Sequence, residues 1–432
     1  MTFHGEAVQW QLKAVVYYMV TVEANSFPRQ EFVARPDSYS PNHAEHVTAA
    51  LNLLRIDYKG YTLYRAGLPG YGRPFFRDMV IASSLFSNPE MIAHALVFAG
   101  ALQAKEPDAN TGAQPGKIFH EYDIELQDGV ELEDRLGKNT LFNSCDSNAE
   151  FLSKHEEIIN LTGDWSLFQW QKPVIEAAVD KYVVPQINNR DLFEEDPRHC
   201  GADRFALRVT FWKDSVLLGR PNGEPKYPVV YPFAHIQNLS GLRSAGRMLG
   251  RKDLLEKADR MVQALPDLFD NELNSFFPAV DSDGAVRGIT SDSLHSLAYL
   301  EPGDLPPDIL VRIIRASETL ETKAGYLTLD PESAKGVRDT YHTEYVWPHE
   351  QAGIHKGAKK HLSAAKRSGN RSLTGALEHV IEVSQRPTSF YKNNPGRFPE
   401  LLSVNGVVGP AGQDPQLWCV AAADYFLRQA GL

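Results

Sequence analysis

Cysteine is scarce in this 432-residue chain, which has three. Cys145, Cys200 and Cys419 are widely spaced, form no CxxC pair and have no clustered histidine to complete a metal site. An odd number in this arrangement excludes a disulfide framework and indicates reduced thiols in a cytoplasmic protein. The chain also lacks GxGxxG and Walker sequences and any run of calcium ligands, so we expect no cofactor and no metal.

Clustered positive charge and long apolar runs are missing as well. The formal net charge is −11, and Lys and Arg form no dense cluster that could neutralise a nucleic-acid backbone. The longest apolar stretch near the start, Ala14–Val22, is too short to span a bilayer, and it lacks the basic flank and small-residue cleavage site of a signal peptide. We expect neither a nucleic-acid partner nor a membrane segment.

The composition is that of an ordinary globular protein. Hydrophobic residues make up 43% of the chain and charged residues 23%, which is enough for a substantial core. The length alone would allow two or three average domains, but single large barrels reach this size, so the length does not force a division. A folded enzyme is the starting expectation.

Helical periodicity recurs in pairs along the chain. Asn88-Pro89-Glu90 combines a capping residue with proline at the first helical position, and a helix that is apolar nearly all round is expected to follow. Two helical hairpins are predicted, and each has a glycine at the end of its first helix. They cover 151–182, with Gly163, and 234–265, with Gly250. Leu310, Ile313 and Ile314 indicate a later helix.

Strand signals are few, so we predict an all-α fold. Long segments rich in Gly, Pro and aromatic residues separate the helices, and loops of this length in a compact domain are usually functional. These loops are 64–78, 105–123, 201–230, 270–290 and 321–350. Helical hairpins in a ring, with long loops at one end, describe an (α/α)₆ toroid. Periodicity does not give the number of hairpins.

Four loop segments concentrate aromatic, acidic and cationic residues: Leu68–Asp78, Phe211–Ser215, Tyr345–Glu350 and Arg397–Leu401. Sugars present apolar ring faces to Trp and Tyr, and hydroxyl groups that carboxylates, Arg and His can bind. The segments together therefore predict a sugar pocket.

Hydrolysis of a glycosidic bond needs a protonated carboxyl group that donates to the leaving oxygen and an ionised one that activates water or attacks. Asp214 follows Trp212, which could desolvate it and raise its pKa, although Lys213 would oppose that shift if it pointed inward. Glu400 follows Pro399, whose φ is fixed, and no glycine precedes Gly406 to loosen the segment. Both are candidate catalytic residues.

From about residue 65 to its end, the chain resembles the catalytic domain of glycogen-debranching amylo-α-1,6-glucosidases, within the wider group of six-hairpin glycosidases. Six segments carry the resemblance in the correct order: LPGYGRPFFRD at 68–78, PGKIFHE at 115–121, NSCDSNAEFL at 143–152, WKDS at 212–215, VWPHE at 346–350 and FPEL at 398–401. The resemblance implies six hairpins, with Asp214 as general acid and Glu400 as general base.

The resemblance also implies which residues bind the sugar. They are Tyr71, Arg77, Asp78, His120, Glu121, Asp146, Trp212, Lys213, Trp347, His349 and Glu350. The group inverts configuration, so the two catalytic carboxyl groups are expected to lie roughly 6.5 to 9.5 Å apart.

Three departures from the family pattern bear on the substrate. WKDS continues as VLL, Glu350 stands where an Asp is usual, and Gly70 replaces an aromatic residue. Glu350 consequently competes for a catalytic role. Residues 1–60 are too few for the β-rich domain that often precedes the barrel. We expect them to form a helical segment packed on a single catalytic domain at 61–432.

The predicted function is hydrolysis of an α-glucosidic bond in an oligosaccharide or small glucoside, with no prediction of oligomeric state. Two alternatives remain open. The first is another specificity on the same fold, such as a neutral invertase or a glucosylglycerate hydrolase. The second is a non-catalytic sugar-binding protein.

Overall fold

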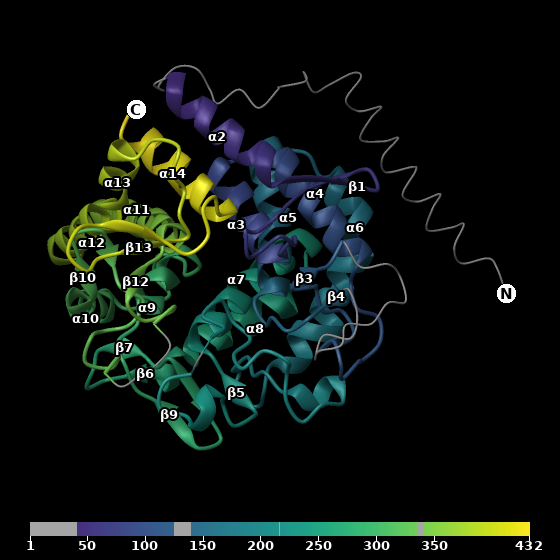
Figure 1. Ribbon diagram of the computed structural model, residues 1–432. Helices are drawn as coiled ribbons and strands as arrows, with labels where there is room; N and C mark the ends of the chain where they lie inside the picture. Colours follow the sequence, from purple (N-terminus) through teal and green to yellow (C-terminus); the bar gives the residue numbers. More distant parts are fainter. Residues whose placement is uncertain (1–40, 125–139, 216, 336–339) are drawn as a thin grey trace.

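A computed structural model describes residues 41–124, 140–215, 217–335 and 340–432 (Figure 1). The apolar run Ala14–Val22 and most of the helical segment expected at 1–60 lie outside these ranges. Within them, no helix is both long enough and apolar enough to cross a membrane.

Most of the described chain is helical. The helices are α2 (Pro41–Leu54), α3 (Phe76–Phe86), α4 (Pro89–Ala101), α5 (Ser147–Thr162), α6 (Ser166–Ala177), α7 (Pro232–Leu249), α8 (Lys252–Gln263), α9 (Asp292–His295), α10 (Pro307–Ala316), α11 (Pro348–Ser368), α12 (Arg371–Ser384), α13 (Pro387–Asn393) and α14 (Leu417–Gln429).

These helices form a ring of inner helices, each packed on an outer one (Figure 1). In the described part of the chain, the inner members contact one another in the order α3, α5, α7, α9 with its following 3₁₀ turn η7 (Ser296–Ala298), α11, α14 and back to α3. Their outer partners are α4, α6, α8, α10, α12 and α2 respectively. The predicted (α/α)₆ toroid is confirmed.

The local signals in the sequence act as expected at the helix ends. Asn88 Oδ1 accepts from the Met91 N–H at the start of α4, with Pro89 at the first position. Gly163 and Gly250 end α5 and α7 in the left-handed region, at φ 72° and 66°. The second helix of the first predicted hairpin continues from α6 into a π-helical turn at Ala178–Val183. The apolar residues of α10, Leu310, Ile313 and Ile314, are buried.

Helix α2 belongs to the ring, because it is the outer partner of α14. It is followed by the antiparallel hairpin of β1 (Arg55–Tyr58) and β2 (Tyr61–Tyr64), which packs on α4 and spans residue 60. Among the described residues at 41–60, the expected helical segment is therefore only partly helical. The division into 1–60 and 61–432 stays a prediction.

Strands occur only as small sheets of two or three in the described ranges. Two of them shape the loops at the helix starts: the pair β3 (Glu121–Tyr122) and β4 (Thr140–Leu141), and the three-stranded sheet of β12 (Tyr345–Val346), β13 (Leu401–Ser403) and β14 (Gly409–Ala411). The other strands are β5 (Val229–Val230), β6 (Phe269–Asp270), β7 (Ser275–Phe276), β8 (Ala279–Asp281), β9 (Gly284–Val286), β10 (Glu321–Thr322) and β11 (Gly325–Tyr326).

The ring closes where the segment before α3 meets the segment before α14. The Leu417 N–H donates to the Ala66 carbonyl at 2.8 Å. Across the same junction, the Asp414 N–H donates to the Leu68 carbonyl at 3.0 Å, and the Leu68 N–H donates to the Pro415 carbonyl at 3.1 Å. Helices α3 and α14 then pack side by side. The earliest and latest parts of the ring thereby become neighbours.

Candidate active site

A cavity of about 610 Å³ lies at the end of the ring where the inner helices begin. Its lining includes the first turn of α3 and the residues just before or within the first turns of α11 and α14. Its volume is in the usual range for small-molecule sites. It is lined by Ala66, Gly70, Tyr71, Gly72, Arg73, Phe75, Arg77, Asp78, His120, Glu121, Asp123, Ile124, Leu207, Trp212, Asp214, Tyr341, His342, Trp347, Glu400, Gln416 and Trp418.

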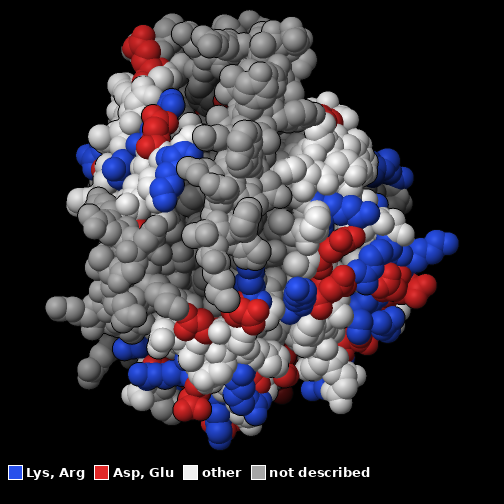
Figure 2. All heavy atoms as spheres, turned by 90° about the vertical axis from the view of Figure 1, so that its right-hand side faces the viewer, with Lys and Arg blue, Asp and Glu red and all other residues white. Residues whose placement is uncertain are grey.

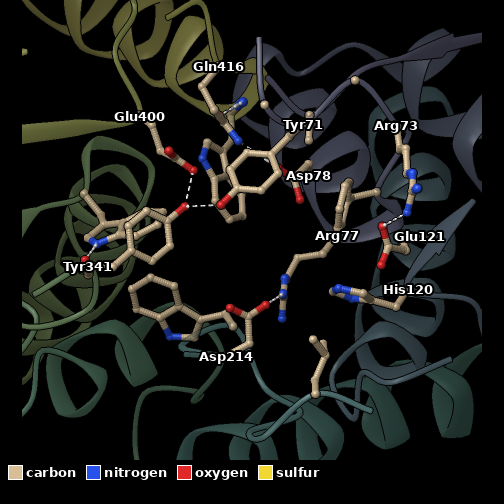
Figure 3. A pocket seen from close by; sticks show the side chains of 18 of the residues that line it. Tyr71, Arg73, Arg77, Asp78, His120, Glu121, Asp214, Tyr341, Glu400 and Gln416 are labelled. Atoms are coloured by element: carbon tan, nitrogen blue, oxygen red, sulfur yellow. Dashed lines mark hydrogen bonds and ion pairs between the residues drawn. The ribbon is translucent and has the colours of Figure 1, made fainter. Parts of the chain in front are cut away.

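Asp214 lies in the long loop that precedes α7, and its carboxyl group faces the cavity (Figure 3). Arg77 Nη2 is 3.3 Å from Asp214 Oδ2. Burial raises the pKa of Asp214 to about 6, Arg77 opposes this shift, and the nearby Asp146 carboxylate adds to it. A carboxyl group with this pKa keeps a useful fraction of its proton near neutral pH, as a general acid requires.

Arg77 is held in place by Asp146 from behind the cavity. Asp146 Oδ2 is 2.8 Å from Arg77 Nη1, and its other oxygen accepts from the Ser144 hydroxyl at 2.5 Å. Asp146 is fully buried at the N-terminus of α5 and does not line the cavity. The predicted contact between Asp146 and substrate is thus replaced by a contact with Arg77.

Glu400 reaches the cavity from the opposite side (Figure 3). Its Oε1 accepts from the Tyr341 hydroxyl at 2.5 Å, and its Oε2 accepts from the Gln413 N–H at 3.1 Å. Burial raises the pKa of Glu400 above its usual value, and these two donors limit the rise because they stabilise the ionised form. The two hydrogen bonds also fix both oxygens, which suits a base that must orient a water molecule.

Gly412, the residue directly after strand β14, leaves room for the Glu400 carboxylate. Gly412 has φ +72°, and a Cβ added there would lie 2.5 Å from Glu400 Oε2. Any other residue would therefore be strained in its backbone and would collide with the carboxylate.

Asp78 lies in the first turn of α3 and lines the same cavity (Figure 3). Gln416 Nε2 donates to Asp78 Oδ1 at 2.8 Å. Burial raises the pKa of Asp78 to about 7 although Arg77 and Gln416 favour its ionised form, and the charges of Glu400 and Asp214 add to the rise. This carboxyl group can exchange hydrogen bonds with a sugar hydroxyl in either protonation state.

Aromatic side chains form the walls of the cavity. They are Tyr71, Phe75, Trp212, Tyr341, Trp347 and Trp418. The Trp212 and Trp347 rings meet edge to face, with centroids 5.6 Å apart, and the His342 ring stacks on Trp347 at 4.9 Å. Such surfaces fit the apolar faces of a sugar ring.

Lys213 and Glu350 point away from the cavity into a buried cluster behind Trp212. Lys213 Nζ is 3.0 Å from Asp292 and 3.8 Å from Glu350, and the Trp212 indole N–H donates to Asp292 at 2.8 Å. Ser291 donates to Glu350 at 2.5 Å. Neither Lys213 nor Glu350 lines the cavity, in contrast to our expectation from the sequence. The cluster instead anchors the Trp212–Asp214 segment.

His349 also lies outside the cavity lining. Its ring stacks on Trp418 with centroids 3.7 Å apart, and the residue is 2% exposed. Its role in the structure is to support a cavity wall, whereas the sequence predicted a direct substrate contact.

In the PGKIFHE segment, the first residues pack in the interior and the last two line the cavity. Gly116 lies so close to the Ala177 carbonyl that an added Cβ would be 2.2 Å away, and Lys117 is fully buried in an ion pair with Glu195 at 3.0 Å. His120 lines the cavity, and burial keeps its pKa well below the usual value, so its ring is neutral. Glu121 lies on the same wall beside Arg73 (Figure 3).

The cavity gathers these predicted residues: Tyr71, Arg77, Asp78, His120, Glu121, Trp212, Asp214, Trp347 and Glu400. Sequence reasoning missed Arg73, Asp123, Tyr341, Gln416 and Trp418. Arg73 stands inside a segment that was singled out, and Tyr341 lies in a predicted functional loop, so both had a signal. Gln416 and Trp418 begin α14, for which no signal was used.

No group of three or more His, Cys, Asp or Glu side chains that could hold a metal ion occurs among the described residues. Where one face of the molecule is drawn in colour in Figure 2, Lys and Arg are interspersed with Asp and Glu. That part of the surface offers no extended area of positive charge.

Solved structures of several glycoside hydrolases are similar to this chain in fold. The GH63 mannosylglycerate hydrolase from Thermus thermophilus, in complex with Tris and D-glycerate, has a TM-score of 0.64 and 12% identity, with 89% of this chain and 99% of that chain covered. A rhamnosidase from Klebsiella oxytoca with rhamnose bound has a TM-score of 0.53 and 12% identity, over 92% of this chain and 66% of that one. A further structure described as a wild-type glycosidase has a TM-score of 0.56 and 14% identity, over 90% of this chain and 97% of that one.

No protein-family model matches the chain, and no curated protein matches it significantly. The similarity to solved structures confirms the fold, because these enzymes share the toroid. The specific likeness to debranching enzymes stays a prediction from the six sequence segments.

Proposed function

We propose that this protein is a glycoside hydrolase that cleaves an α-glucosidic bond in a small glucoside with inversion of configuration. The observation that carries the proposal is the placement of Asp214 and Glu400 on opposite sides of one cavity whose walls are aromatic (Figure 3). The fold similarity to glycoside hydrolases supports the same class of reaction.

In the proposed reaction, Asp214 donates its proton to the glycosidic oxygen as the bond to the anomeric carbon breaks. A water molecule attacks that carbon from the opposite face, and Glu400 accepts the proton that the water loses. Asp214 regains a proton from solvent and Glu400 releases one, so the cycle consumes one water per bond. The separation of the two carboxyl groups is predicted to be roughly 6.5 to 9.5 Å, which leaves room for the water.

Local contacts support this division of roles. Asp214, with its pKa raised to about 6, is suited to carry a proton, whereas Glu400 receives two hydrogen bonds that favour its ionised form. Arg77 and Asp78 would hold the sugar ring between them through its hydroxyl groups. Trp212 and Trp347, whose rings meet edge to face, would contact its apolar surfaces.

The substrate is proposed to be short. The cavity volume of about 610 Å³ suits one or two sugar units. The sequence segments favour an α-1,6 linkage or another small α-glucoside.

The test is glucose release from α-1,2, α-1,4 and α-1,6 glucosides by the wild type, Asp214→Asn and Glu400→Gln, with the released anomer followed by NMR. We expect β-glucose from one linkage and a loss of roughly 10²- to 10⁴-fold in each variant. Thermal unfolding of the variants checks that they are folded. Release of α-glucose would overturn inversion, and sugar binding without turnover would indicate a non-catalytic protein.

A further inference from the structure

The cavity lining carries more acidic than basic groups. Its acidic members are Asp78, Glu121, Asp123, Asp214 and Glu400, and its guanidinium groups are Arg73 and Arg77. Burial keeps the pKa of His120 and His342 well below the usual value, so these two rings add no positive charge. Even with Asp78 and Asp214 protonated, three carboxylates face two guanidinium groups, so the lining remains negative.

Both guanidinium groups are already engaged by carboxylates of the chain. Arg77 binds Asp146 at 2.8 Å and Asp214 at 3.3 Å. On the other wall, Arg73 Nη2 lies 2.7 Å from Asp123, and Nη1 lies 3.4 Å from Glu121. A ligand carboxylate that recruited Arg73 would leave Glu121 and Asp123 without that partner and would itself lie close to both. Such like-charge contacts disfavour an anion.

The helix N-termini around the cavity also do not provide free positive charge that could bind an anionic ligand in place of a cationic side chain. Asp78 lies in the first turn of α3, Asp146 at the N-terminus of α5 and Glu350 in the first turn of α11. The Asp146 carboxylate offsets the positive end of the α5 dipole, whereas Asp78 and Glu350, whose pKa values burial raises to about 7 and about 8, do so only when they are ionised. At α14, the side chain of Gln416 accepts from the N–H groups of Trp418 and Cys419.

Three buried polar atoms of the lining have no hydrogen-bond partner among the described residues: Arg77 Nε, Trp418 Nε1 and His120 Nδ1. The last belongs to the His120 ring, and that residue is 3% exposed. Because the ring is neutral, it can exchange a hydrogen bond with a hydroxyl group but cannot pair with an anion as a cation would. The free position on His120 therefore suits an uncharged, hydroxyl-bearing ligand, and the N–H groups of Arg77 and Trp418 can donate to oxygens of the same ligand.

From these charges we infer that the leaving group of the substrate is uncharged or cationic, and that the cavity discriminates against a leaving group that bears a carboxylate. The inference rests on the proposed glycosidase function and narrows its substrate class. It also separates this chain from the structurally similar enzyme that was solved with D-glycerate, despite the shared fold.

A matched pair of ligands tests the inference without depending on turnover. The thio-linked α-D-glucosides of glycerol and of D-glycerate, both attached at C2, resist hydrolysis and differ only in CH₂OH against COO⁻. Calorimetry on the wild-type protein at low salt is expected to show at least 10-fold tighter binding of the glycerol compound. The difference should shrink at high salt as charges are screened. Equal binding, tighter binding of the glycerate compound, or binding of neither overturns the inference.

A variant of the Arg73 wall gives a second measurement. Asp123→Asn removes the closer of the two carboxylates and makes the Arg73 guanidinium available to a ligand. The ratio of the dissociation constants of the glycerate and glycerol compounds is therefore expected to fall at least 5-fold. Arg73→Met removes the cation instead, so this ratio should rise. An unchanged ratio in both variants would show that charge on this wall does not determine the preference. Should the neutral ligand bind while no oxygen-linked glucoside is hydrolysed, the proposed function fails and the charge preference stands.

Discussion

The hydroxyl group of Tyr341 lies 2.5 Å from Oε1 of Glu400, and it can act only as the donor in this bond. Burial and the Glu400 charge both raise the pKa of Tyr341 far above its usual value, so the phenol keeps its proton. The hydroxyl groups of Tyr341 and Tyr71 are also 3.2 Å apart. The candidate base is thus oriented by a residue that lines the same cavity.

Replacement of Tyr341 by Phe is expected to lower kcat roughly 10- to 100-fold, the value of a hydrogen bond to a charged group. Because this bond lowers the pKa of Glu400, its loss raises that pKa. The acidic limb of the pH profile of kcat/KM should therefore move to higher pH. Tyr71→Phe keeps the Tyr341–Glu400 bond and should leave the limb in place. An unmoved limb in Tyr341→Phe would contradict the assignment of that limb to Glu400.

The basic limb of the same profile should report Asp214. With the pKa of Asp214 at about 6, the protonated acid is lost as the pH rises through 6, so kcat/KM should fall about 10-fold per pH unit beyond that.

In Asp146→Asn, Asp214 loses a negatively charged neighbour and Arg77 interacts with Asp214 alone, and both effects lower the pKa of Asp214. The basic limb should shift to lower pH, measured on protein that still unfolds cooperatively. The buried Arg77 loses a charged partner, so the free energy of unfolding should drop by roughly 3 kcal/mol.

Glu350 provides a contrast, since it is acidic and close to the site but shielded from the cavity. Burial raises its pKa to about 8, against an ordinary 4.5, although Lys213 opposes the shift. Ionisation of Glu350 therefore costs free energy in the folded state, and the protonated form stabilises the fold relative to the ionised form. This stabilisation is fully present below pH 4.5 and is lost as the pH rises through 8.

Glu350→Gln should therefore gain stability relative to the wild type between pH 5 and pH 9, on the order of 3 kcal/mol. Its kcat at the pH optimum should remain within about 3-fold of the wild type, because Glu350 does not line the cavity. Thermal unfolding at several pH values checks the first expectation, and glucose release checks the second. A loss of activity as large as that of Asp214→Asn would restore the catalytic role that the sequence left open.

Gly412 and Gly406 form a matched pair. Both have positive φ, +72° and +80°, so an alanine at either position costs about 1 kcal/mol in the backbone. Only at Gly412 would the new Cβ meet a side chain, Oε2 of Glu400 at 2.5 Å, whereas nothing lies within 4 Å at Gly406. Gly412→Ala should lower kcat roughly 100-fold by displacing the base, and Gly406→Ala should leave it nearly unchanged. Similar kcat values in the two variants would show that the close contact with Glu400 is unimportant.

The sequence predicted features of the local backbone correctly, but it did not predict which side chains face the cavity. Asn88, Gly163 and Gly250 act through their own backbone, so their patterns predicted the helix ends correctly. Trp212 and Asp214 face the cavity, whereas Lys213 between them faces away. At the start of α11, Trp347 lines the cavity while His349 and Glu350 do not. Adjacency in a motif cannot distinguish these directions, because neighbouring side chains along a loop or helix point differently.

The missed residues Gln416 and Tyr341 act through partners far away in the sequence. Gln416 binds Asp78, and Tyr341 binds Glu400. Neither contact follows from periodicity or local motif, because it forms only when segments that are distant in the sequence come together. The buried pair of Lys213 with Asp292 belongs to the same class.

The segments before α3 and α14 contact each other, so the active site can be completed only late in the synthesis of the chain. Asp78 and Gln416 are 338 positions apart, so a ribosome working at typical rates needs roughly 20 to 70 s to progress from one to the other. Throughout that interval, the face of α3 that α14 will cover has no partner. The nascent chain also lacks Glu400 and is therefore unable to catalyse the proposed reaction. Only after the last inner helix has emerged can the ring close and the two walls of the cavity meet.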